Sequence, residues 1–120
     1  MLRQITGITS EPFQKWKTSI DQGIIGFSLT YRPAIQMWFL SLTFGVFEVK
    51  SLRVCQSLNL LHQFKKILPF GLYIEILDGV EPFLIDDFYT ERVKINIIDQ
   101  TDIDQIDLYY QAQKDLIEII

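Results

Sequence analysis

The stretch "IIGFSLTYR", residues 24–32, decides the fold class because its side chains alternate with a period of two. Every second residue is large and apolar or aromatic: Ile25, Phe27, Leu29 and Tyr31. Successive side chains of a strand point to opposite faces, so this alternation predicts a strand that buries one face. Pro33 is expected to end the strand, because proline has no backbone N–H to continue the pairing.

The segments on either side repeat the alternation. "KWKTSI", residues 15–20, precedes a turn signal at Asp21-Gln22-Gly23. "IQMWFLSLTF", residues 35–44, is followed by Gly45, which marks a turn or bulge, and by the extended "VFEVKSLRV", residues 46–54. Short strands joined by tight turns predict a β-meander over this part of the chain.

The next segment changes period. "SLNLLHQFKKIL", residues 57–68, has apolar side chains at helical spacing, with Ser57 as a candidate N-cap and Pro69 as a stop. We therefore expect a helix near residues 57–68. Two more strands are expected at "LYIEIL", residues 72–77, and "RVKINIID", residues 92–99, because both alternate and turn residues lie between them.

The tail favours a second helix. From Thr101 onward apolar residues recur at steps of three or four, and residues 99–120 hold six acids and one lysine. The expected fold is mainly β (α+β): a small antiparallel β-sandwich or barrel-like core with a helix near 57–68 and a C-terminal helix. We expect one core domain at 1–98 and an acidic helical extension at 99–120.

Charge is distributed unevenly along the chain. Residues 1–77 carry eight Lys or Arg against four Asp or Glu, a net charge of +4; residues 78–120 carry three against eleven, a net charge of −8. Such a split suits head-to-tail packing of copies or docking onto basic neighbours. Nucleic-acid binding needs a concentrated basic face, so no nucleic-acid specificity is expected. No uncharged run is long enough for a membrane-spanning helix.

The chain has few residues of the kinds that act in catalysis or bind metals. The single cysteine, Cys55, excludes an internal disulfide, and the single histidine, His62, excludes a two-histidine metal site. No phosphate-binding glycine motif occurs. We therefore expect no enzyme activity, no catalytic residue, no metal and no cofactor.

The strongest acidic feature is the pair Asp86-Asp87 in "FLIDDFYTE", residues 83–91. Adjacent strand residues point to opposite faces, so two neighbouring carboxylates do not readily share one metal or one proton. The interpretation is a structural turn, in which an aspartate bonds backbone two residues on, or an interface acid. A hydrolase that uses either carboxylate stays a minor alternative.

Taken in order, these segments resemble the small baseplate plug proteins of contractile-tailed bacteriophages, of the cyanophage type with a simple baseplate. The resembling pieces cover roughly residues 11–98 and are, in order along the chain, "FQKWKTSI", "FSLTYRPAIQMWFLSL", Gly45, "LNLLHQF", "GLYIEI" and "IDDFYTERVKINIID". No single piece is specific, and the collinear order carries the resemblance. The chain departs from the family pattern at Tyr89, where glycine is common, and in the tail beyond residue 100.

The resemblance implies a structural virion protein without catalytic activity, made in the host bacterial cytoplasm and located in the tail baseplate. Such a plug would sit at the centre of the baseplate and help to close the tube before injection. Its partners would be the hub, the tail tube or tube initiator and the spike, with several copies under threefold or sixfold symmetry.

An alternative is a small β-rich binding or adaptor module that uses an aromatic ligand face: Trp16, Tyr31, Trp38 and Tyr73. For the assembly protein, the predicted interface combines the acidic pair with the apolar side of the tail helix. It comprises Ile106, Tyr109, Tyr110, Leu116, Ile117, Asp86 and Asp87.

Overall fold

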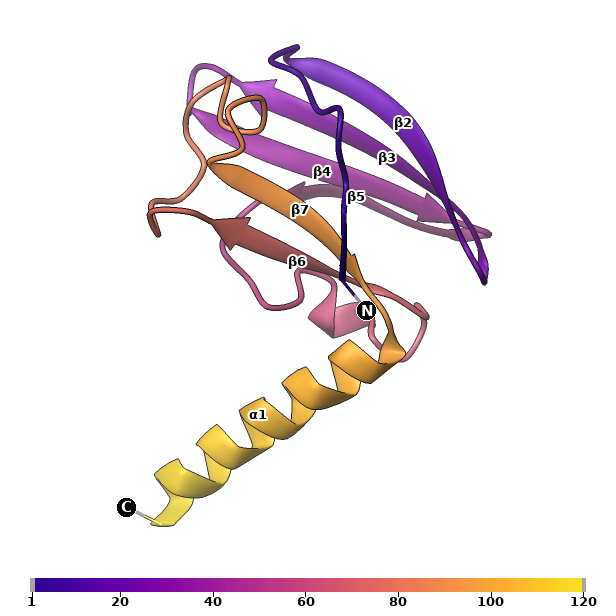
Figure 1. Ribbon diagram of the computed structural model, residues 1–120, viewed down its shortest axis with the longest axis vertical. Helices are drawn as coiled ribbons and strands as arrows, with labels where there is room; N and C mark the ends of the chain where they lie inside the picture. Colours follow the sequence, from indigo (N-terminus) through magenta and orange to yellow (C-terminus); the bar gives the residue numbers. More distant parts are fainter. Residues whose placement is uncertain (1, 120) are drawn as a thin grey trace.

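The computed structural model describes the backbone of residues 2–119 and the side chains of residues 2–116. Two antiparallel sheets face each other (Figure 1). The four-stranded sheet has the order β2 (Phe13–Ile20), β3 (Gly23–Arg32), β4 (Met37–Phe44), β5 (Phe47–Arg53). The three-stranded sheet has the order β1 (Leu2–Gln4), β7 (Val93–Ile98), β6 (Gly71–Ile76), and helix α1 (Gln100–Ile119) follows β7. The mainly β fold class and the C-terminal helix are thus confirmed.

Turn residues set the register of the four-stranded sheet. Ile20 pairs with Gly23 across the Asp21-Gln22 turn, and Phe44 pairs with Phe47 across a turn in which Gly45 has a φ of 59°. A positive φ is accessible to glycine without a steric penalty, so Gly45 permits this two-residue hairpin. The predicted turns at both positions are confirmed.

The alternation read from residues 24–32 produces the core. The even-numbered residues of β3 lie on the solvent side of the sheet. Its odd-numbered residues from Ile25 to Tyr31 are buried against the three-stranded sheet, together with the inward residues of β4, β6 and β7. Trp38, Leu40, Leu72 and Ile95 are completely buried there. Apolar burial of this kind stabilises a fold by about 25 cal/mol per Å², so the contact between the sheets holds the domain together.

The prediction of a helix near residues 57–68 is wrong. The structure has only a short 3-10 helix, η1 (His62–Phe64). Before it the chain runs extended beside β6: the N–H of Ile74 donates to the carbonyl of Ser57, and the N–H of Leu60 donates to that of Leu72. Asn59 explains the difference, since its buried Oδ1 accepts the N–H groups of Leu61 and Leu72 and so competes with helical bonding.

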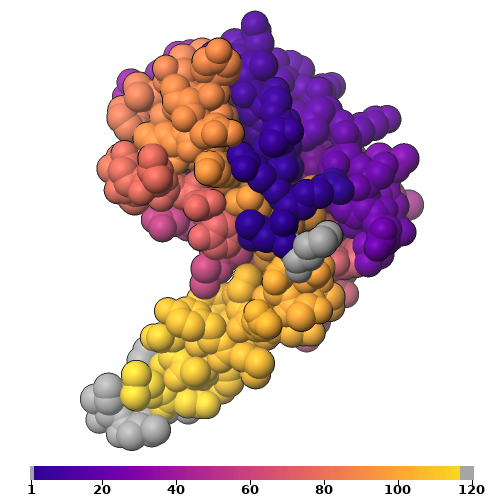
Figure 2. All heavy atoms as spheres, viewed as in Figure 1, coloured from indigo at the N-terminus to yellow at the C-terminus, as the bar shows by residue number. Residues whose placement is uncertain are grey.

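The first strand, β1, was not predicted. It adds to the edge of β7, with Arg3 opposite Ile97, and the chain then crosses to the other sheet. Arg3 ties the two sheets together because its guanidinium donates to the Thr18 hydroxyl and, at 3.1 Å, to the Ser19 carbonyl. This N-terminal segment runs over the surface between the two sheets (Figure 2).

Helix α1 leaves the core and projects from it (Figures 1 and 2). Its N-terminal part is anchored by Ile103, which is buried, and the N–H of Ile103 donates to the carbonyl of Asp99. From Leu108 to Leu116 every described side chain is exposed. The helix therefore begins as part of the core and ends as a free arm.

Candidate functional site

The acidic pair lies in the loop between β6 and β7, residues 77–92, where Asp87 organises the backbone. Its Oδ2 accepts the N–H groups of Phe83 and Leu84, each at 2.8 Å. Only 1% of Asp87 is exposed. The predicted structural turn is therefore present, but the carboxylate bonds residues three and four positions earlier, not two positions later.

Arg92 completes this arrangement. Its Nε lies 2.9 Å from Asp87 Oδ1 and its Nη2 lies 2.7 Å from Asp87 Oδ2, a two-pronged contact of guanidinium with carboxylate. Nη1 also donates to Asp78 Oδ1 and to the Val80 carbonyl, at 2.7 and 2.6 Å. One cation thus joins the two ends of the loop.

These contacts shift the pKa values of the three ionisable groups. Burial alone would raise the pKa of Asp87, but the hydrogen bonds from Arg92 and from the N–H groups of Leu84 and Phe83 outweigh it, and the pKa is lowered. The bond to the Val80 N–H and the contact with Arg92 lower the pKa of Asp78. The pKa of Arg92 is raised, first by its bond to Asp87. All three groups are charged at neutral pH.

Core aromatic residues hold the other side of the loop. The Tyr31 hydroxyl donates to the Phe83 carbonyl at 2.7 Å, and Trp38 Nε1 donates to the Leu84 carbonyl at 3.0 Å. The ring of Phe88 packs edge-on against Trp38, with centroids 5.1 Å apart. Tyr31 and Trp38 are buried, and Trp16 is half-buried against Phe27, so the predicted aromatic set does not form one exposed face.

The structure separates the two predicted interface acids. Asp86 is exposed and stays in the predicted interface. The prediction that Asp87 belongs to the interface is corrected. Its carboxylate is buried and already accepts four N–H groups, so it is not presented to a partner. Sequence reasoning missed Arg92 as the partner, although its position five residues after Asp87 was visible.

Around this rigid frame the loop exposes apolar side chains. Those that are large and well exposed are Leu77, Val80, Phe83, Leu84, Ile85 and Tyr89. Leu77 is the most exposed of them, at 84%. Exposed apolar groups gathered on one ordered loop are typical of a surface that another molecule covers.

The predicted interface residues of α1 fall into two groups. Ile106 is half-buried near the core, whereas Tyr109, Tyr110 and Leu116 are exposed. The side chain of Ile117 lies outside the described residues. Tyr110 packs edge-on against His62, with ring centroids 5.4 Å apart, and Asp107 Oδ1 lies 3.0 Å from Lys65 Nζ. These contacts hold the helix to the core as far as Tyr110.

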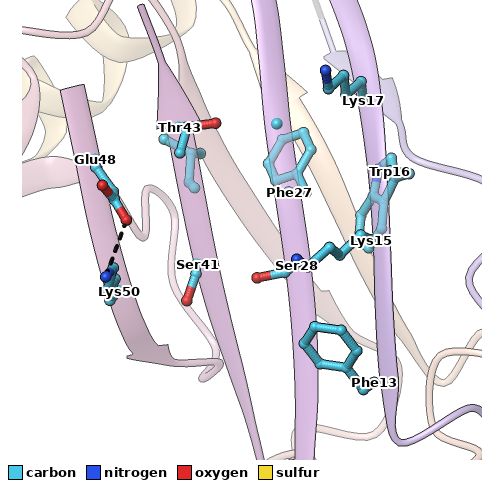
Figure 3. Close-up of a pocket in the computed structure, with 12 residues that line it drawn as sticks. Phe13, Lys15, Trp16, Lys17, Phe27, Ser28, Ser41, Thr43, Glu48 and Lys50 are labelled. Atoms are coloured by element: carbon cyan, nitrogen blue, oxygen red, sulfur yellow. Dashed lines mark ion pairs between the residues drawn. The ribbon is translucent and has the colours of Figure 1, made fainter. Parts of the chain in front are cut away.

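The outer face of the four-stranded sheet carries a trough of about 600 Å3 (Figure 3). Its floor consists of small residues from the two central strands: Gly26, Ser28, Ser41 and Thr43. Its sides are formed by Phe13, Lys15 and Lys17 of β2 and by Glu48 and Lys50 of β5. Sequence reasoning missed this site, although the small polar residues that alternate with the core residues of β3 and β4 were its signal.

Groups for metal or nucleophilic chemistry are scattered. Within the described part of the chain, no three His, Cys, Asp or Glu side chains lie close enough to hold a metal ion. Burial, followed by the charge of Glu81, raises the pKa of the half-buried Cys55 thiol, so it stays protonated at neutral pH. No helix among residues 2–119 has the length and apolar character that crossing a membrane requires.

Comparison with known proteins adds no relative: the chain matches no protein-family model, and no curated protein matches it significantly.

Proposed function

We propose that this chain is a structural virion protein, a plug component of a contractile phage tail baseplate. It packs at the centre, where the hub, the tail tube or tube initiator and the spike meet, and it helps to close the tube before injection. The proposal begins from the collinear resemblance over residues 11–98. The observation that carries it furthest is the ordered loop of residues 77–92, which combines a rigid polar frame with exposed apolar side chains.

The loop frame suits a protein that works by packing. Asp87 and Arg92 bond both ends of the loop, and Tyr31 and Trp38 donate to its carbonyls. A surface that is already ordered loses little conformational entropy when it binds. Burial of its apolar side chains against a neighbour then contributes directly to affinity.

Charge supports the same proposal. The acidic second part of the chain, at −8, and the basic first part, at +4, match a site between neighbours of unlike charge. Asp86, Tyr109 and Leu116 are the exposed members of the predicted interface with which we would begin mutagenesis. Under threefold or sixfold symmetry each contact repeats around the tail axis.

Mass spectrometry of purified, salt-washed phage particles tests the proposal. We expect the chain in every particle, in a fixed ratio to the hub protein that is consistent with threefold or sixfold symmetry. A phage with the gene deleted should assemble defective tails. If the chain is abundant in the lysate but missing from washed particles, the proposal is wrong.

The alternative, a binding or adaptor module, needs a surface other than the one predicted. Its aromatic face would have included Tyr31 and Trp38, which are buried in the core. A thermal-shift and fluorescence screen checks this alternative: a small ligand that raises the melting temperature of the isolated chain would favour it over the assembly role.

A further inference from the structure

The trough on the outer face of the β2–β5 sheet has a low floor in the middle of the sheet. There the outward positions of β3 and β4 are Gly26, Ser28, Ser41 and Thr43, whereas the larger Ile24 and Phe39 lie beyond the two ends of this floor. A Cβ at Gly26 would lie 2.5 Å from Thr43 Oγ1, so a larger residue there would displace the Thr43 side chain. Small floor residues let an approaching backbone come close to the sheet, while the longer side chains of β2 and β5 flank it (Figure 3).

The β2 side of the trough carries positive charge. Lys50 pairs with Glu48 at 3.4 Å, but among the described residues neither Lys15 nor Lys17 forms an ion pair. Lys15 lies only over the ring of Phe13, at 5.4 Å from its centroid. Two exposed lysines at alternate positions of one edge strand thus face solvent on the side of the trough.

The C-terminal half of α1, residues 109–119, has features that complement the lysines and the small floor of the trough. Tyr109, Ala112 and Leu116 follow one another at steps of three and four residues, so they form one exposed apolar stripe. The last turn of the helix contains no basic residue, although lysine or arginine is favoured there to offset the negative end of the helix dipole. Asp115 adds negative charge next to the stripe.

The dimensions of the two surfaces agree. The C-terminal half of the helix, residues 109–119, is roughly 16 Å long at about 1.5 Å per residue. Four strands spaced by about 4.8 Å give a sheet face roughly 14 Å across, and its strands of seven to ten residues are roughly 23–33 Å long. A helix about 10 Å in diameter therefore fits on this face.

The helix of the same chain does not occupy the trough. It leaves the core after β7 and is anchored by the buried Ile103, whereas the trough lies on the face of the β2–β5 sheet that is turned away from β6 and β7 (Figure 1). We propose that the trough receives the C-terminal half of helix α1, residues 109–119, of a second copy of this chain. Lys15 and Lys17 then meet Asp115 and the negative end of the helix, and Leu116 lies over the small floor.

This contact joins two different surfaces, so it leaves one trough and one helix unused in every pair. Contacts of this kind close into a ring when the rotation between copies allows it and otherwise extend into a chain. The inference rests on these surfaces alone and does not require the tail function, since a self-associating protein of any role would use them in the same way.

Three purified variants of the full chain test the proposal by analytical ultracentrifugation from micromolar to millimolar concentration. The sheet variant carries Lys15→Glu and Lys17→Glu, the helix variant carries Tyr109→Ser and Leu116→Ser, and the matched control carries Lys66→Glu at an exposed lysine outside the trough. We expect the unmodified chain and the control to associate in a concentration-dependent manner. Each of the other two variants alone should stay monomeric, with circular dichroism confirming that both are folded.

An equimolar mixture of the sheet variant and the helix variant gives the decisive result. Each supplies the surface that the other lacks, so one intact contact forms and the mixture should contain dimers that do not grow further. The proposal is overturned if the unmodified chain is monomeric at millimolar concentration, if either variant still associates like the unmodified chain, or if the mixture contains only monomers.

Discussion

The guanidinium of Arg92 meets the carboxylate of Asp87 through two parallel contacts, Nη2 to Oδ2 at 2.7 Å and Nε to Oδ1 at 2.9 Å. The carboxylate is buried and the arginine is the only cation bonded to it among the described residues. This pair gives the loop of residues 77–92 a fixed shape, and it leads to the first two predictions.

Removal of one partner of the pair should destabilise the protein strongly. For Asp87→Ala or Arg92→Ala we expect a loss of about 3–5 kcal/mol in the free energy of unfolding, because the remaining buried charge or its donors lose their partner. Arg92→Lys should recover only part of this loss, since lysine lacks the planar fork. Urea unfolding followed by tryptophan fluorescence measures each change. Asp86→Asn, at the exposed neighbour, is the control and should change stability by less than about 0.5 kcal/mol. An equally small effect of Arg92→Ala would contradict the assigned role.

Stability should fall in acid because the pKa of Asp87 is lowered in the folded state. The unfolded chain binds a proton near an ordinary aspartate pKa of about 3.9, whereas the folded chain binds it only at lower pH. The contribution is therefore fully present above that ordinary pKa and is lost as the pH falls through the folded-state pKa. Urea unfolding at a series of pH values between neutrality and pH 3 should show this decline. In Asp87→Asn the decline should be shallower; an unchanged slope would assign the acid sensitivity to other carboxyl groups.

Gly71 and Asn59 should show strong coupling. A Cβ on Gly71 would lie 2.5 Å from Asn59 Oδ1, and that oxygen accepts the N–H groups of Leu61 and Leu72. We expect Gly71→Ala to cost about 1–3 kcal/mol through overpacking and Asn59→Ala to cost about 1–3 kcal/mol through unpaired buried N–H groups. The double variant should cost clearly less than the sum, because the collision is absent once Asn59 is shortened. A double-mutant cycle from chemical denaturation measures this, and additive losses would argue against the collision.

The anchor of α1 should depend on packing more than on charge. Ile103 is buried, so Ile103→Ala should lower the free energy of unfolding by about 2–4 kcal/mol. Asp107→Asn removes the half-exposed ion pair with Lys65 and should cost less than about 1 kcal/mol. Thermal and urea unfolding of the two variants give the comparison. The reverse order of the two effects would mean that the polar contacts carry the attachment.

Self-association through the trough should weaken with salt. The lysines of β2 and the acidic end of α1 attract across an exposed contact, and the screening length falls from about 10 Å at 0.1 M ionic strength to about 3 Å at 1 M. We expect the dissociation constant from analytical ultracentrifugation to rise several-fold over this range. The Lys66→Glu control should show the same salt dependence. Association that strengthens with salt would indicate a purely apolar contact on another surface.

Local sequence determined most of the strands and the final helix of this protein. The alternation in residues 24–32 and 35–44 predicted β3 and β4 because a strand with one buried face has a period of two. Gly45 and the Asp21-Gln22-Gly23 turn predicted the hairpins, since turn geometry depends on neighbouring residues. The acidic amphipathic tail predicted α1 for the same reason: a helical period is a local property.

Tertiary structure decided what depends on partners distant in sequence. Residues 57–68 have a helical pattern, yet Asn59 bonds the Leu72 N–H thirteen residues away and the segment lies extended along β6. β1 has too few residues for a periodic signal and exists because β7 offers it an edge. Asp86 and Asp87 are identical neighbours in the sequence, and only the position of Arg92 and the loop N–H groups makes one buried and the other exposed. The trough likewise exists because pairing of β2 to β5 places their outward side chains side by side, and such pairing is a property of the assembled sheet and not of any one strand.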